Sequence, residues 1–505
     1  MAKLKLYNEQ RFDVRPRMFG SFLEHMGTVI YTGIYEPGHP SATPEGFRGD
    51  VLKLVRNLGV KTLRYPGGNY TSSYHWEDTI GDKKTRPKRM NIAWQSLETN
   101  QFGLDEFFQW IQQAKIDNPI LTVNLGTRGI DDALHELEYV NGKYDTDWAN
   151  LRRQNGHKDP YGVKYWCLGN ELDGPWQVAS RTPEEYGLLA NETAKAMKLM
   201  DPDIETILVG SSTPRLSTYP SWDFKVLMAA YDNVDYIAMH DYVDRDQSEN
   251  LDQESLRESD DLPTYLARSL EFDKQIEEVA TIADAVKALK HSDKTMKISF
   301  DEWNVHHFSQ KESQPWSEHN PVDWCYFNLA DTLLFGSMAL AILRHGDRVK
   351  LSCQALLVNT IPLILTDEGG SAWANPTYYV LQSLLRNLSE TSSVVKTSMV
   401  DSKRYSTERY QDVPVVDQVV VDTGSSFVVF AVNRENENQT VSIDLPKVIK
   451  DGHMEHIVGN LKDMNTREHP EMLTLQPCDT TINSGSKSQS VLLAGYSWNV
   501  VTFNY

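Results

Sequence analysis

Eight short apolar runs recur from about Phe19 to Leu385, and stretches of helical periodicity lie between them. Alternating strands and helices build parallel sheets, and eight such units predict a (β/α)₈ TIM barrel, an α/β fold. A doubly wound open sheet is the alternative. It is disfavoured because Gly67 and Gly68 lead into Asn69, which is not the spacing of a dinucleotide-binding loop. The predicted strands are residues 18–22, 62–65, 120–124, 165–168, 206–209, 236–239, 297–300 and 353–358.

Two kinds of helical signal accompany these strands. Thr182 and Pro183 have the residue types of a helix cap and a first helical residue, which predicts a helix from there to about Met200. The apolar run at residues 333–343 is too short to span a bilayer, which takes about 20 residues, so we interpret it as a buried helix.

The hydropathy pattern changes after residue 385, where strand-like alternation replaces helical periodicity. Strands are expected at residues 415–421, 427–432, 440–445 and 491–503, which predicts an all-β, jelly-roll-like sandwich. Residues 3–7 also alternate and could add a strand to it. We therefore expect a catalytic barrel over residues 13–385 and a β-sandwich built from residues 1–12 plus 386–505. Polar insertions at 244–261 and 309–319 follow the sixth and seventh strands and could border a site.

The charge balance narrows the range of partners. A net charge of -20 and a pI of about 5.2 disfavour nucleic acid and anionic membranes, and suit a neutral substrate. The four cysteines are far apart and form no CxxC pair, so a disulfide framework or thiolate zinc site is not expected. The first residues lack the apolar region of a secretory signal, which leads us to expect a cytoplasmic protein.

Polar residues cluster directly after the predicted strands, at the end of a barrel where active sites lie. They are Glu24, His25, Arg64, Asn69, Asn124, Asn170, Glu171, His240, Tyr242, Asp301 and Glu302. A lone glutamate at such a place is as often a surface ion-pair partner. Glu171 and Glu302, however, follow the fourth and seventh strands, which lie across a barrel from each other.

Hydrolysis of a glycosidic bond requires two carboxyl groups, and Glu171 and Glu302 can supply them. A separation of about 5 Å predicts retention of anomeric configuration, whereas about 6.5–9.5 Å predicts inversion. Asn170 suits a ligand of a sugar hydroxyl, although it could instead cap the loop. Trp94, Trp176 and Trp303 could stack on sugars, but packing is the commoner role for any one tryptophan.

Other chemistries are poorly supported. His306 and His307 are adjacent, and adjacent side chains on an extended segment point to opposite sides, so they do not make a metal pair. There is no HExxH spacing and no GxSxG elbow. We therefore expect no metal site.

The stretches around these residues resemble glycoside hydrolase family 51, the intracellular α-L-arabinofuranosidases. The similar segments are FGSFLEHMGTVIYTGIYEPG, LRYPGGNY, WQSLETNQFGLDEF, WCLGNELDGPW, HDY, FDEWNV, LLVN and GGSAWANPTYYV, in the family's order through the barrel. The resemblance implies a retaining, exo-acting enzyme that needs no cofactor and releases terminal α-L-arabinofuranosyl residues from arabino- or arabinoxylo-oligosaccharides. It also implies a homo-oligomer, with the hexamer frequent in the family.

The resemblance assigns residues as well. Glu171 matches the family's acid/base and Glu302 its nucleophile. The sugar-binding positions correspond to Glu24, Asn69, Asn170 and Tyr242, and Arg64 supports the nucleophile. Trp94, His240 and His306 complete the predicted substrate-binding set.

Two positions depart from the family pattern. A glutamine in an AQLVN stretch usually touches the sugar, but this chain has Leu356 there, and Gln354 replaces it only if the strand register shifts. His306 stands where an aromatic residue often follows EWNV. These departures concern subsite specificity. The alternatives that remain are another barrel glycosidase, such as a xylosidase or endo-glycanase, and a non-catalytic carbohydrate-binding protein.

Overall fold

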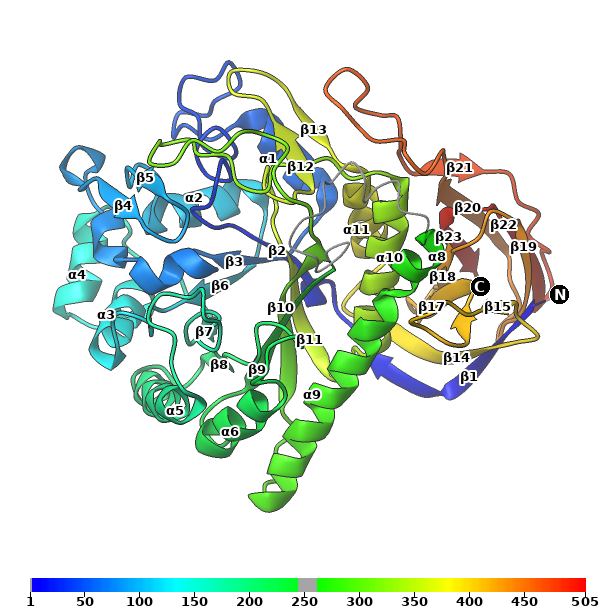
Figure 1. Ribbon diagram of the computed structural model, residues 1–505, viewed down its shortest axis with the longest axis horizontal. Helices are drawn as coiled ribbons and strands as arrows, with labels where there is room; N and C mark the ends of the chain where they lie inside the picture. Colours follow the sequence, from blue (N-terminus) through cyan, green and yellow to red (C-terminus); the bar gives the residue numbers. More distant parts are fainter. Residues whose placement is uncertain (1, 244–260) are drawn as a thin grey trace.

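The computed structural model describes residues 2–243 and 261–505, so the predicted insertion at 244–261 lies almost wholly outside the described residues. Eight strands form a closed barrel in which every neighbouring pair is parallel, which confirms the predicted fold (Figure 1). In barrel order they are β10 (Lys297–Val305), β11 (Val349–Gln354), β2 (Phe19–Phe22), β3 (Thr62–Tyr65), β6 (Asn118–Thr122), β7 (Tyr165–Cys167), β8 (Glu205–Leu208) and β9 (Tyr236–Val243).

The residue range predicted for the eighth barrel strand was wrong. It was expected at residues 353–358 but is β11, at Val349–Gln354. Residues 355–358 leave the strand as a buried loop, and Val358 makes only an isolated bridge to Ile364. An apolar run has the same composition in a strand and in a buried loop, so hydropathy alone could not locate the boundary.

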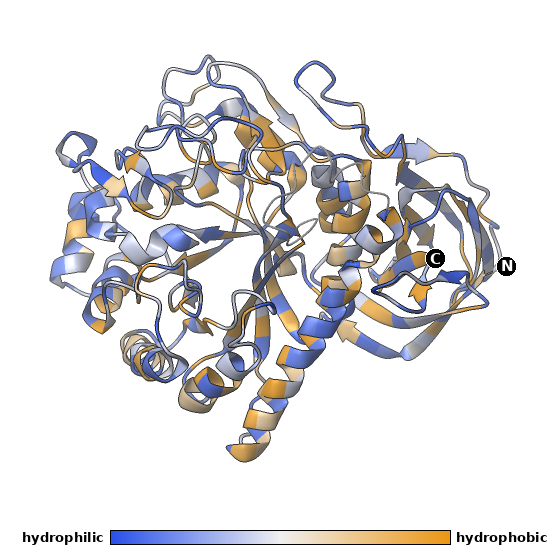
Figure 2. Ribbon diagram, viewed as in Figure 1, coloured by the Kyte–Doolittle hydropathy of each residue, from blue (hydrophilic) through white to orange (hydrophobic). Residues whose placement is uncertain are grey.

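Helices surround the barrel and present apolar stripes to it (Figure 2). α1 (Gly49–Leu58) buries Val51, Leu52, Val55 and Leu58, and ends at Gly59 in the left-handed conformation. The outer helices also include α2 (Leu104–Ala114), α3 (Ile130–Asn141), α4 (Asp147–Gln154), α5 (Pro183–Met200), α6 (Ser221–Ala230), α8 (Leu262–Ala267), α9 (Ser269–Leu289) and α11 (Pro376–Arg386). The Thr182 cap predicted for α5 is confirmed, because its hydroxyl accepts a hydrogen bond from the Glu185 amide.

The helix α10 (Leu329–Arg344) joins the two parts of the molecule. Its residues from Leu329 to Leu343 are all buried, as predicted for the apolar run. One side packs on the barrel, and the other meets the C-terminal sheet, where a Cβ on Gly336 would lie 2.8 Å from the Trp498 ring. Trp498 also donates a hydrogen bond to the Ser383 hydroxyl on α11, at 3.1 Å. A tight apolar interface therefore fixes the sheet against the barrel.

The C-terminal sheet has nine strands and includes the N-terminus of the chain, as the alternation at residues 3–7 predicted (Figure 1). β1 (Ala2–Asp13) lies between β14 (Ser393–Val400) and β19 (Gln439–Asp444). The sheet encloses its own apolar core, to which Leu4, Ile443 and Val501 all contribute. The remaining strands are β17 (Val416–Asp422), β18 (Ser426–Asn433), β20 (Asp451–Ile457), β21 (Gln476–Cys478), β22 (Ser488–Leu493) and β23 (Ser497–Asn504).

The predicted strand at 491–503 is in fact two strands, β22 and β23, which separate around Gly495 and Tyr496. β14, β20 and β21 were not predicted. β14 is only partly buried along its length, so its hydropathy pattern is weak.

The mouth of the barrel is bordered by two loops. A hairpin of β4 (Arg89–Asn91) and β5 (Ser96–Glu98) carries Trp94 at its turn. The predicted insertion at 309–319 lies against this hairpin, where the Trp316 amide bonds to the Gln95 carbonyl oxygen. The helices of the described residues include none with the length and apolar character needed to cross a membrane.

Candidate active site

A pocket of about 650 Å³ opens at the end of the barrel where the strands finish. Seven of the ten predicted site residues line it: Glu24, Asn69, Trp94, Glu171, Tyr242, Glu302 and His306. The other three, Arg64, Asn170 and His240, are buried directly behind this lining and contact the two glutamates or each other. A larger cleft of about 880 Å³, beside β1, β14 and β17, contains none of the predicted residues.

Glu171 reaches the pocket because the backbone turns sharply after β7. Gly169 has φ of 101° and Glu171 itself has φ of 45°. A left-handed conformation is unusual for a glutamate, and such residues concentrate at functional sites. The turn places the Asn170 and Glu171 side chains at the barrel mouth.

A β-bulge in β10 positions the second glutamate. Against β9, Ser299 pairs with Ala238 but Glu302 pairs with His240, so β10 contains one extra residue there. Two successive side chains, Asp301 and Glu302, consequently reach the same guanidinium, that of Arg64. A regular strand would have placed them on opposite faces.

Glu302 is held by hydrogen bonds to both of its oxygens. Arg64 donates to Oε1 at 2.6 Å, and the Tyr242 hydroxyl donates to Oε2 at 2.8 Å. The second terminal nitrogen of Arg64 donates to Asn170 Oδ1, also at 2.6 Å. Asn170 in turn donates to Asn69 Oδ1 at 3.1 Å. The charge-assisted bond from Arg64 and the bond from Tyr242 fix the Glu302 carboxylate in direction.

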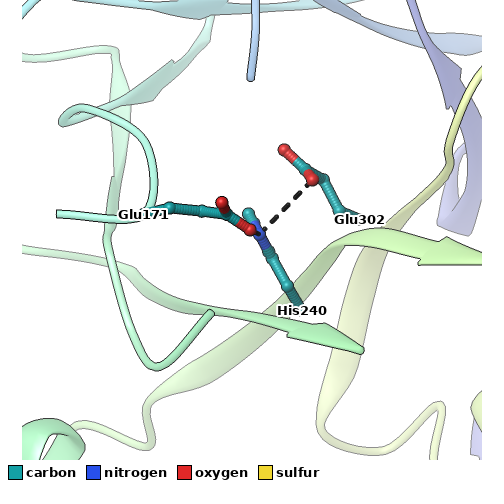
Figure 3. A group of neighbouring side chains, drawn as sticks. All are labelled: Glu171, His240 and Glu302. Carbon is teal, nitrogen blue, oxygen red and sulfur yellow. Dashed lines mark hydrogen bonds and ion pairs between the residues drawn. The ribbon is translucent and has the colours of Figure 1, made fainter. Parts of the chain in front are cut away.

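Glu171 lies on the other side of the pocket. Trp176 Nε1 donates to its Oε2 at 2.6 Å, and His240 Nδ1 is 2.9 Å from its Oε1. Figure 3 shows both carboxylates directed toward the His240 ring. One oxygen of each glutamate and one ring nitrogen of His240 lie within 4.8 Å of one another.

These three groups are also the one set of potential metal ligands found among residues 2–243 and 261–505. A cation there would compete with protein donors, because Arg64 and Tyr242 already occupy both oxygens of Glu302. The arrangement of donors suits two carboxyl groups that face a substrate.

Glu24 is a third carboxyl group in the pocket. Its Oε1 accepts hydrogen bonds from Trp94 Nε1 at 2.7 Å and from the Tyr70 amide at 2.9 Å. Gly68 is required beside it, because a Cβ there would lie 2.0 Å from Glu24 Oε2. Burial, reinforced by the charge of Glu302, raises the pKa of Glu24 to about 8. Since Oε1 already faces two N–H donors, the proton of the neutral acid is carried on Oε2.

The raised pKa of Glu24 leads to a prediction for folding stability. A carboxyl group with a folded-state pKa near 8 and an ordinary unfolded value stabilises the fold fully only at low pH, and this stability is lost as pH rises toward 8. Glu24→Gln mimics the neutral acid and removes that loss. We expect the melting temperature of E24Q to exceed that of the wild type by an amount that grows from about pH 5 and levels off above about pH 8. Calorimetry across this range checks it, and a constant difference would contradict it.

The two departures from the family pattern are both in contact with the pocket. Leu356 lines the pocket. Gln354 does not supply the missing amide, because both ends of its side chain are already bonded: Oε1 accepts from the Ser21 hydroxyl, and Nε2 of Gln354 donates to the Leu356 carbonyl oxygen. The pocket wall formed by Leu356 and Ile361 is therefore apolar. His306 lines the pocket with its ring against Tyr242 and its Nε2 3.1 Å from Asp323 Oδ2.

Some residues of the site were not foreseen in the roles they have. Trp176 was considered as a stacking residue, but its indole N–H bonds to Glu171. Trp303 packs on Phe335 in the core, with ring centroids 4.9 Å apart, and does not reach the pocket. Arg215, Phe308 and Asp323 line the pocket without a sequence signal, because they come from loops whose path the strand pattern does not determine.

Comparison with known proteins agrees with this fold. The family model for the Alpha-L-arabinofuranosidase 1 domain matches residues 54–261, and that for the Alpha-L-arabinofuranosidase C-terminal domain matches residues 301–497. The intracellular exo-α-(1→5)-L-arabinofuranosidase 1 of Bacillus subtilis (strain 168) is 41% identical over 515 residues, covering 99% of each chain. An exo-α-(1→6)-L-arabinofuranosidase of Bifidobacterium longum is 38% identical, covering 99% of this chain and 97% of the relative.

A solved structure of a family 51 α-L-arabinofuranosidase from Bifidobacterium longum superposes with a TM-score of 0.91 at 37% identity, over 100% of this chain and 99% of that one. Identity of this extent over the whole length covers both the barrel and the C-terminal sheet. The chain therefore belongs to the α-L-arabinofuranosidases of glycoside hydrolase family 51.

Proposed function

We propose that this protein is a retaining, exo-acting α-L-arabinofuranosidase in which Glu302 is the nucleophile and Glu171 the general acid/base. The observation that carries the proposal is that oxygens of the two glutamates lie within 4.8 Å of each other across one pocket. Retaining glycosidases hold their carboxyl groups about 5 Å apart, whereas inverting enzymes need room for a water molecule and hold them about 6.5–9.5 Å apart.

The first half of the reaction forms a covalent intermediate. A carboxylate oxygen of Glu302 attacks the anomeric carbon, the bond to the leaving oxygen breaks, and Glu171 supplies the proton that this oxygen needs. Arg64 and Tyr242 fix the direction of the nucleophile, since each donates to a different oxygen of Glu302. Glu24, Asn69 and Asn170 offer polar groups for the sugar hydroxyls, and Trp94 and His306 complete the surroundings of the ring. His240 contacts Glu171 from behind the pocket lining.

The second half releases the sugar. Glu171, now ionised, takes a proton from water, and the oxygen of that water attacks the anomeric carbon and displaces Glu302. Two displacements on the same carbon return the configuration of the substrate. The two steps use two carboxyl groups of the chain and one water molecule.

The substrate class and setting follow from the family. We propose terminal α-L-arabinofuranosyl residues of arabino-oligosaccharides or arabinoxylo-oligosaccharides as the substrate, within arabinan catabolism in the cytoplasm, and a homohexamer as the assembly. The two relatives above are named for (1→5) and (1→6) linkages, and both linkage types present an arabinofuranosyl residue at a chain end. Residues 13–385 would form the catalytic unit, and residues 1–12 with 386–505 the β-sandwich.

The proposal is tested by following hydrolysis of 4-nitrophenyl α-L-arabinofuranoside with proton NMR. We expect the α-anomer of arabinose to appear first and the β-anomer only later, through mutarotation. First release of the β-anomer would reject the retaining mechanism. A panel of nitrophenyl xylosides and glucosides tests the alternative glycosidase, and saturable binding of arabinosides without any hydrolysis would favour the non-catalytic alternative.

A further inference from the structure

His240 occupies an unusual position between three carboxyl groups. Nδ1 lies 2.9 Å from Glu171 Oε1 and 3.5 Å from Glu302 Oε2, and Nε2 lies 3.3 Å from Asp301 Oδ1. The imidazole is 4% exposed and does not line the pocket. It therefore acts on the substrate only through its neighbours, and both of the glutamates proposed for catalysis are among them.

The contacts of Glu171 restrict where its proton can lie. Oε2 faces the indole N–H of Trp176, at 2.6 Å, and an N–H donor leaves no room for a second hydrogen on that line. Oε1 faces His240 Nδ1, at 2.9 Å. Oε1 and Nδ1 are therefore close enough for a proton to pass directly between the two residues.

We propose that His240 stores the catalytic proton on Nδ1 in the resting enzyme and passes it to Glu171 as Glu302 becomes esterified. Asp301, which faces Nε2, is the positioning residue that holds the ring in this state. The inference rests on the proposed function, because it assigns a source to the proton that Glu171 donates.

The charges around the ring favour storage on His240. Burial disfavours an imidazolium, but Glu302, Asp301 and Glu171 outweigh burial and raise the pKa of His240 well above its ordinary value. The pKa of Asp301 is lowered despite its burial, chiefly by Arg64 and also by His240, so Asp301 remains charged. The other titratable groups near the ring are Arg64 on β3, Cys167 on β7, Asp173 in the loop after β7, and Tyr242 on β9.

Esterification of Glu302 provides the trigger. When Glu302 forms its bond to the anomeric carbon, it loses its negative charge. That charge is the largest of the attractions that hold the proton on His240, so its loss weakens the hold. The proton moves from Nδ1 to Glu171 and from Glu171 to the leaving oxygen as the glycosidic bond breaks. His240 becomes neutral with Nε2–H toward Asp301. In the second half, a water proton returns through Glu171 to Nδ1 while the ester bond breaks.

Asp301→Asn tests this idea by removing the charge with little change of shape. We expect the basic limb of the kcat/KM profile on 4-nitrophenyl α-L-arabinofuranoside to move to lower pH by about 1 unit or more, and the acidic limb to stay in place. The matched control is Asp241→Asn, which removes a neighbouring buried charge that pairs with Arg215. A uniform loss of activity with both limbs unmoved would overturn the proposal, because it would make Asp301 merely structural.

A second measurement requires neither turnover nor a correctly folded D301N variant. In protein labelled with ¹⁵N-histidine, the His240 signals are identified by their loss in His240→Asn. Both ring nitrogens should be protonated at neutral pH, and the proton should be lost at lower pH in Glu302→Gln, which removes the same charge as esterification. A neutral His240 in the wild type, or identical titration in E302Q, would reject the proposal. Absence of arabinofuranoside hydrolysis by the wild type would reject the proposed function instead and leave this measurement valid.

Discussion

Glu302→Ala is expected to lower kcat on 4-nitrophenyl α-L-arabinofuranoside by roughly 10⁴- to 10⁶-fold while the protein remains folded. The loss is large because no other carboxylate lies where it can attack the anomeric carbon: Glu171 is committed to Trp176 and His240, and Glu24 to Trp94 and Tyr70. The measurement is steady-state kinetics, with circular dichroism to establish that the variant is folded.

Azide provides the decisive control for Glu302. In the alanine variant a small anion can enter the space left by the carboxylate and attack from the same face, which gives an arabinosyl azide of inverted configuration. Glu136→Gln is the matched variant: Glu136 is a buried glutamate on α3 outside the pocket, and its change should leave kcat close to the wild-type value. Near-normal activity of E302A would remove Glu302 from the mechanism.

Glu171→Ala should show a loss that depends on the leaving group. On an arabino-oligosaccharide, whose leaving oxygen needs a proton, we expect kcat/KM to fall about 10²- to 10⁴-fold. On 4-nitrophenyl arabinofuranoside the first step should be nearly preserved, because nitrophenolate leaves without protonation, and the slow second step should appear as a burst. Azide should restore turnover and give a product of retained configuration.

The opposite pattern would be equally informative. If E171A lost the same factor on both substrates, Glu171 would have a structural role and another residue would supply the proton. Trp176→Phe tests the neighbourhood independently, since it removes only the N–H that bonds to Oε2. The two variants together separate loss of the acid from loss of its orientation.

The barrel could be predicted from the sequence because eight apolar runs with helices between them leave few other folds. Seven of the ten predicted site residues line one pocket for the same reason: strand ends of a barrel share one rim. The sandwich was predicted less completely. β14 was not predicted because only Val394 and Val395 are buried along it, so its hydropathy pattern is weak. The turn near Gly495 lies inside a long apolar segment, which hid the boundary between β22 and β23.

The parts that could not be predicted are those set by irregular backbone. Asp301 and Glu302 are adjacent in sequence, and only the bulge in β10 brings both of them to Arg64. Likewise, the left-handed conformation of Glu171 aims its side chain but has no counterpart in residue type. Such local departures depend on contacts with distant segments, so hydropathy and propensity contain no record of them.

The pairing of β1 has a consequence for folding during protein synthesis. The last residue of β1, Asp13, pairs with Ser393, which lies 380 positions later in the chain. At a synthesis rate of about 5–20 residues per second, that partner leaves the ribosome roughly 20–80 s after β1. For this interval the first strand has open hydrogen-bonding edges while the barrel assembles behind it. The C-terminal sheet therefore closes on β1 long after β1 has been made. Chaperones that bind unpaired nascent strands would need to protect β1 for this whole interval.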